Sequence, residues 1–144
     1  GGLKNVLCLP YQPLNRLAAS LSAADLQVVV MGDAFVGLVH PCKIYNILAV
    51  GAPVLYIGPA PGHVTEIVDR LADAHPAGLV RHGEAGRLVT EIRRLRQTAG
   101  SGLRTGSELV ATAFGMAVLL PQLVAAIEGQ KPETLKVGIS KTES

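Results

Sequence analysis

Residues 26–33 read Leu-Gln-Val-Val-Val-Met-Gly-Asp, a short apolar run that a glycine and an aspartate bring to an end. β-Branched residues favour strands, and a short run without polar alternation is typical of a strand that is covered on both faces. Such strands belong to parallel sheets with helices packed on each side. The run therefore predicts a parallel α/β fold.

The chain on either side alternates between strand-like and helical patterns. Upstream, residues 5–9 predict a buried strand, and residues 14–24 predict a helix because their apolar spacing changes to three and four. Downstream, we predict helices at 41–50, with Gly51 just past the end, and at 62–70 and 84–97, and strands at 53–57 and 77–80. This alternation indicates βαβ units, and we predict a Rossmann-like parallel sheet with flanking helices.

The last part of the chain differs from the rest. Helical patterns run from about residue 103 to 128, with Pro121 as a kink or a helix junction. Residues 109–127 carry no charge and approach the ~20 residues that a membrane span needs. No Lys/Arg cluster flanks them closely, and a helix buried in a larger protein has the same pattern, so we expect no membrane span. Residues 130–144 are polar, and we expect a disordered tail.

Composition excludes several classes of function. The chain has 144 residues, of which 49% are hydrophobic and 17% charged, so we expect a folded domain rather than a disordered chain. Three Tyr, two Phe and no Trp offer little for base stacking, and a net charge of +2 is small for a nucleic-acid-binding protein. Cys8 and Cys42 form neither a disulfide scaffold nor a zinc motif. We therefore expect no nucleic-acid partner, no metal and a reducing compartment.

The candidate site lies where the predicted strands end. Ligands of open parallel sheets bind outside the carboxyl ends of the strands, which here are followed by residues 31–40 and 58–62. Each of these loops leads into the N-terminus of a predicted helix, where unpaired N–H groups favour anions. Lys43 stands in the first turn of one such helix, against the usual preference for acids there. Two helix N-termini at one edge predict a clamp for a diphosphate.

Residues 40–54 carry a family resemblance. They read His-Pro-Cys-Lys-Ile-Tyr-Asn-Ile-Leu-Ala-Val-Gly-Ala-Pro-Val, which resembles the donor-site segment of family 4 GT-B glycosyltransferases. The similar subgroup acts in capsule, exopolysaccharide and O-antigen assembly and reads Pro-Ser-Lys-x-Tyr, then Ala-x-Gly-x-Pro-Val. Weaker similarity extends over about residues 5–129. The resemblance implies that residues 1–129 are part of the C-terminal, nucleotide-sugar-binding domain of such an enzyme, followed by its terminal helices.

The resemblance also implies a substrate and its contacts. The donor is a nucleotide sugar, usually a UDP-sugar, and the glycosyl group is transferred with retention. Lys43 would hold the diphosphate, Asn46 would stand in for a glutamate that binds the ribose, and Leu38 replaces another motif glutamate. The catalytic residues stay unknown. The donor-binding candidates are Val39, His40, Pro41, Cys42, Lys43, Asn46, Gly62 and Glu66.

Further expectations concern partners and alternatives. The family's acceptor domain and the first strands of its donor domain would precede residue 1, so we expect a truncated chain that is catalytically incomplete by itself. The implied location is the cytoplasm, with the inner face of the membrane as a place of peripheral contact for the full enzyme. No cofactor is implied, since the nucleotide sugar is a substrate. A sugar-nucleotide epimerase of GT-B architecture and a non-catalytic α/β partner-binding module remain the alternatives.

Overall fold

The computed structural model describes residues 2–71, 75–98, 110 and 112–130. Within them, β1 (Gln27–Val30), β2 (Val54–Ile57) and β3 (Ala77–Val80) form a parallel sheet in the order β1-β2-β3. The register pairs the first residues of the three strands with one another, and it also pairs their last residues. The predicted α/β fold with a Rossmann-like parallel sheet is confirmed at this level.

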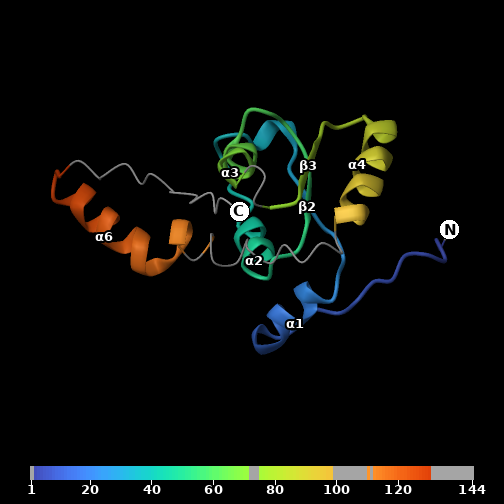
Figure 1. Ribbon diagram of the computed structural model, residues 1–144, viewed down its shortest axis with the longest axis horizontal. Helices are drawn as coiled ribbons and strands as arrows, with labels where there is room; N and C mark the ends of the chain where they lie inside the picture. The colour runs from blue at the N-terminus through green and yellow to red at the C-terminus, as the bar shows by residue number, and fades with distance from the viewer. Residues whose placement is uncertain (1, 72–74, 99–109, 111, 131–144) are drawn as a thin grey trace, which may run out of the picture.

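Helices cover both faces of the sheet. Figure 1 shows α2 and α3 on one side of it and α4 on the other. The bounds of the helices are 3-10 helix Leu14–Arg16, α1 Leu17–Ser22, 3-10 helix Asp33–Phe35, α2 Lys43–Ala49, α3 His63–Leu71, α4 Ala85–Thr98 and α6 Met116–Ile127. The three helices predicted at 41–50, 62–70 and 84–97 are therefore present: the first is shorter than predicted, and the other two are shifted by one residue.

The core lies mainly between the sheet and the α2/α3 layer. Val54 and Tyr56 of β2 pack there, against Ile44, Ile47 and Leu48 of α2. Leu55 lies between them in sequence and packs on the other face with Leu95 of α4, as alternation along a strand requires. Because both faces of β2 are covered, its sequence is continuously apolar.

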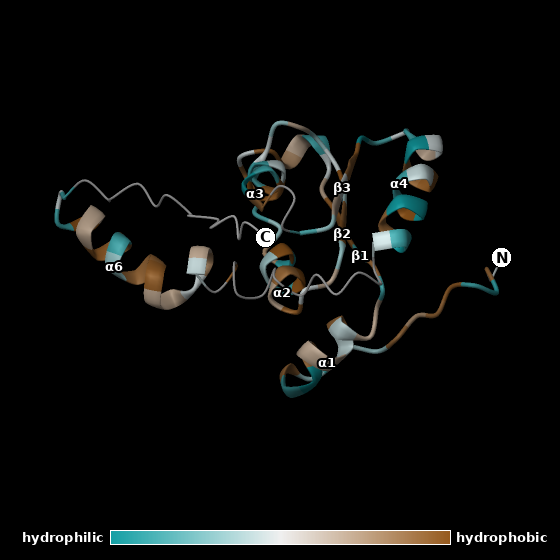
Figure 2. Ribbon diagram, viewed as in Figure 1, coloured by the Kyte–Doolittle hydropathy of each residue, from teal (hydrophilic) through white to brown (hydrophobic). Residues whose placement is uncertain are grey.

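The predicted strand at residues 5–9 is absent. The segment has no regular structure, and Leu7 and Leu9 are 80% and 66% exposed. A strand is stable only when its backbone pairs with a neighbour, and Pro10 limits how far this segment could continue as one. Figure 2 shows the N-terminal arm, residues 2–11, extending from the body with much of its length in the hydrophobic colour. The predicted helix 14–24 is also shorter, since a 3-10 turn replaces its first residues.

The C-terminal part that the structure describes is dominated by α6. This helix has 12 residues and contains Pro121, so this proline does not separate two helices. Residues 103–109 of the predicted helical region and the predicted tail from residue 131 lie outside the described residues. No helix in the described ranges is long and apolar enough to cross a membrane.

Candidate functional site

The three strands deliver their following loops to one edge of the sheet. Met31 N–H donates to the Ile57 carbonyl at 3.0 Å, and Gly58 N–H donates to the Val80 carbonyl at 3.0 Å. The ladder thus continues one residue beyond β1 and β2 before the chain turns away. In a parallel α/β sheet this is the edge at which ligands bind.

Gly58 allows the loops at this edge to approach closely. A Cβ at this position would lie 2.6 Å from Tyr56 Oη and 2.8 Å from the Met31 carbonyl oxygen. The Tyr56 hydroxyl in turn donates to the Pro59 carbonyl at 3.3 Å. A side chain at residue 58 would therefore push apart the loops that follow β1 and β2.

The loops before α2 and α3 meet through aromatic side chains. His40 precedes α2 and His63 begins α3, and their ring centroids lie 4.0 Å apart at an interplanar angle of 88°. Tyr45 Oη lies 2.7 Å from His63 Nε2, and the Tyr45 ring also contacts Phe114. The expectation that the two loops lie at one edge of the sheet is confirmed for the segments that contain His40 and His63.

Burial favours the uncharged forms of Tyr45 and His63. Burial lowers the pKa of His63, and the neighbouring His40 and Arg70 lower it further against the opposing effect of Glu66. Burial also raises the pKa of Tyr45, with a smaller contribution from Cys42. At neutral pH the Tyr45 hydroxyl and a neutral His63 ring thus share one hydrogen bond. We call the group of His40, Tyr45 and His63 the loop cluster.

The Lys43 side chain contacts the β1 edge of the sheet and not the loop cluster. Its Nζ donates to the Val28 carbonyl at 3.4 Å. The N–H groups of Gln27 and Met31 donate to carbonyls on the β2 side of β1. Because the backbone groups of successive residues point to alternate sides of a strand, the Val28 carbonyl faces the other side of β1, away from β2. Lys43 therefore lies along the β1 edge rather than against the loop cluster, although its side chain is exposed.

The other predicted site residues flank the loop cluster in sequence. Val39, Cys42, Asn46 and Glu66 are exposed and Pro41 is half-buried. The Cys42 thiol donates to the His40 carbonyl at 3.4 Å, which ties the end of the loop together.

Gly62 takes part in a local turn. Its N–H donates to Thr65 Oγ1 at 2.8 Å, while that hydroxyl donates to the Gly62 carbonyl at 2.7 Å. The Gly62 N–H thus already has an acceptor within the first turn of α3.

Two adjoining pockets at the same edge were not predicted from the sequence. One of about 270 Å³ is lined by Asp33, Pro59, Ala60, Arg81 and His82. The other, of about 210 Å³, shares Ala60 and Arg81 with it and adds Arg87. The signal was present in the sequence, because Arg81 and His82 directly follow the predicted strand 77–80.

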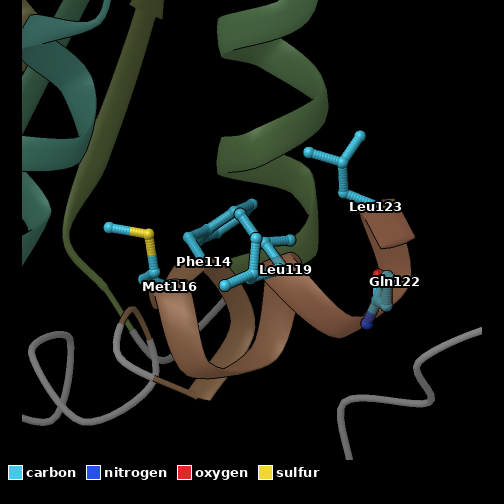
Figure 3. A pocket seen from close by; sticks show the side chains of 6 residues that line it. Phe114, Met116, Leu119, Gln122 and Leu123 are labelled. Carbon is cyan, nitrogen blue, oxygen red and sulfur yellow. The ribbon is translucent and has the colours of Figure 1, made fainter. Parts of the chain in front are cut away.

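A larger apolar groove of about 740 Å³ lies on α6. Its lining is Phe114, Met116, Leu119, Leu120, Gln122 and Leu123. Figure 3 shows that these side chains come from α6 and the residues just before it. The described residues give its lining one amide and no charged group, and such a lining is unsuited to a phosphate.

No group of three or more His, Cys, Asp or Glu side chains that could hold a metal ion occurs in the part of the chain that the structure describes. No protein-family model, no curated protein and no solved structure matches the chain. The α/β architecture and the edge at which its loops converge therefore rest on the structure of this chain itself.

Proposed function

We propose that the chain is part of the donor-binding domain of a family 4 GT-B glycosyltransferase and binds the diphosphate of a nucleotide sugar, such as a UDP-sugar. The observation that carries the proposal is the contact between His40 and His63, whose ring centroids lie 4.0 Å apart. This contact lies where the segments that lead into α2 and α3 meet. The resemblance of residues 40–54 to the family's donor segment supports it.

The chemistry of the loop cluster suits a diphosphate. A neutral imidazole keeps one N–H donor, and the lowered pKa of His63 means that this ring meets the ligand without a positive charge of its own. An arriving dianion raises the pKa of a nearby histidine, so ligand binding and proton uptake by His63 are coupled. The positive end of the α3 dipole adds to the attraction.

Lys43 supplies the charge in this proposal. Its bond to the Val28 carbonyl is long at 3.4 Å and joins it to a neutral acceptor, so little is lost when it breaks. The ammonium group stands on a flexible four-carbon stem and gains a charge-assisted bond when it turns to a phosphate. Asn46, one turn further along α2, is the proposed partner of the ribose hydroxyls, and Glu66 is the proposed neighbour of the sugar.

We further propose that the enzyme transfers a glycosyl group in the cytoplasm, during the assembly of a surface polysaccharide. In such a reaction the diphosphate leaves with negative charge, which the groups that hold it stabilise. The role of this chain is therefore to bind the leaving group, while the acceptor and the acid or base belong to the rest of the enzyme.

Thermal unfolding with UDP, GDP, ADP and NAD tests the proposal. A ligand at a hundred times its Kd adds about 2.7 kcal/mol to the free energy of unfolding, and each kcal/mol raises the Tm of a domain of this size by about 2–4 °C. We expect UDP to raise the Tm most, Lys43→Ala to reduce the shift, and Lys4→Ala, at an exposed lysine in the arm, to leave it unchanged. Equal shifts in all three proteins, or no shift with any nucleotide, would contradict the proposal.

A further inference from the structure

The pocket of about 270 Å³ is built by the loops that follow all three strands. Asp33 comes from the loop after β1, Pro59 and Ala60 from the loop after β2, and Arg81 and His82 from the loop after β3. We call it, together with the adjoining pocket of about 210 Å³ that contains Arg87, the β3 pocket. The convergence of three loops at the carboxyl edge is the arrangement that parallel α/β sheets use to hold ligands.

The loop after β3 is held in place by its own contacts. His82 Nε2 donates to the Met31 carbonyl at 2.8 Å, which ties this loop across the end of β2 to the end of β1. The Arg81 N–H donates to Glu84 Oε2 at 2.9 Å, and Gly83 between them has a φ of +84°. These contacts fix the backbone at Arg81 while its side chain stays exposed.

Positive charge in the β3 pocket is poorly compensated. Among the described residues, the guanidinium group of Arg81 makes no ion pair, and Arg87 lies 3.7 Å from Glu84 in a pair whose side chains are 58% and 37% exposed. An exposed pair of this kind contributes little free energy, so Arg87 can exchange Glu84 for a ligand at low cost. Arg87 also stands in the first turn of α4, where the helix dipole disfavours a cation. A bound anion would relieve both effects.

Asp33 narrows the choice of anion. A carboxylate that lines the same pocket repels a bare anion but accepts hydrogen bonds from hydroxyl groups. The two pockets together have room for a small ligand and not for a dinucleotide. A ligand with an anionic end and a hydroxyl-rich end matches this lining.

We propose that the β3 pocket binds a phosphorylated monosaccharide, with its phosphate on Arg81 and Arg87 and a hydroxyl group on Asp33. This site is separate from the loop cluster, uses none of its residues and does not depend on the function proposed above. The planar guanidinium groups suit phosphate oxygens, since each presents paired N–H donors.

Calorimetric titration with glucose 1-phosphate, inorganic phosphate and glucose tests this proposal. We expect glucose 1-phosphate to bind more tightly than inorganic phosphate and glucose not to bind. Arg81→Gln should weaken both phosphate ligands about tenfold, whereas Asp33→Asn should weaken glucose 1-phosphate alone. Arg93→Gln, at an exposed arginine of α4 outside the pocket lining, should bind like the wild-type chain.

The histidine resonances locate the ligand. In NMR spectra we expect glucose 1-phosphate to shift the imidazole signals of His82 and to leave those of His63 in place. Larger shifts at His63, an Arg81→Gln variant that binds like wild type, tighter binding of phosphoethanolamine than of glucose 1-phosphate, or no binding by the wild-type chain would each overturn the proposal.

Discussion

Gly51 ends α2 with a left-handed backbone, at a φ of +69°. Its N–H donates to the Leu48 carbonyl at 2.9 Å, and the Ala52 N–H donates to the Ile47 carbonyl at 3.2 Å, which together form a Schellman motif. A Cβ in this conformation costs about 1–2 kcal/mol. We therefore expect Gly51→Ala to lower the free energy of unfolding by about 1 kcal/mol in urea titrations.

Gly86 provides the matched control for that prediction. It lies in α4 with open space around the position of a Cβ and without a positive φ. Alanine is the better helix former by about 0.8–1 kcal/mol, so Gly86→Ala should raise the free energy of unfolding. If the two variants change stability in the same direction, the left-handed backbone at residue 51 is not what makes glycine favourable there.

His75 makes the stability of the fold depend on pH. The residue is 3% exposed, its Nε2 donates to the Ala52 carbonyl at 2.9 Å, and burial is the main cause that lowers its pKa. The unfolded chain therefore binds a proton near pH 6.5 that the folded chain does not. Above pH 6.5 His75 should not make the free energy of unfolding depend on pH. Below pH 6.5 the free energy of unfolding should fall as the pH drops, by up to about 1.4 kcal/mol per pH unit.

Urea titrations at pH 7.5 and 5.5 measure this effect. His63, whose pKa is also lowered, contributes in the same direction. We expect the loss of stability between the two pH values to be smaller in His75→Gln than in the wild-type chain. An equal loss in both proteins would show that burial of His75 does not set the pH dependence.

Helix α2 joins the core to the candidate site, because one face packs on the sheet while its N-terminus follows His40. Ile47 is 0% exposed in the centre of that face. Truncation of a buried isoleucine to alanine costs about 2–5 kcal/mol. Ile47→Ala should thus lower the urea midpoint strongly, and Val89→Ala, at a 46% exposed position of α4, should lower it much less. Similar losses in both variants would mean that α2 is not the main packing element.

The sequence predicts some helices and strands more accurately than others. The strand 77–80 was predicted with its observed bounds, and β1 and β2 only lost residues at their ends, because continuous apolar runs between turn residues are local signals. Residues 5–9 have a similar local pattern, but pairing with a distant strand decides whether they form a strand. The loop positions followed from topology, whereas the direction of Lys43 and the contact between Tyr45 and His63 depend on side-chain conformations that no sequence pattern encodes.

In the part of the molecule that the structure describes, the buried core comes mainly from the sheet and from helices α2, α3 and α4, whereas residues 2–11 of the N-terminal arm are all exposed. Leu3, Leu7 and Tyr11 of the arm are 70%, 80% and 99% exposed. Deletion of residues 2–9 should therefore change the free energy of unfolding by less than about 0.5 kcal/mol in urea titrations. A loss above about 1 kcal/mol would mean that the arm packs on the folded body.

The proposed function requires a nucleoside diphosphate to bind where the loops before α2 and α3 meet. NMR titration of the chain with UDP, followed at the imidazole signals of His40 and His63, tests it most directly. We expect the signals of both rings to shift together and to saturate at one UDP concentration, and we expect Lys43→Ala to move this concentration higher. Unchanged signals from both rings at saturating UDP, or shifts in which Lys43→Ala makes no difference, would contradict it.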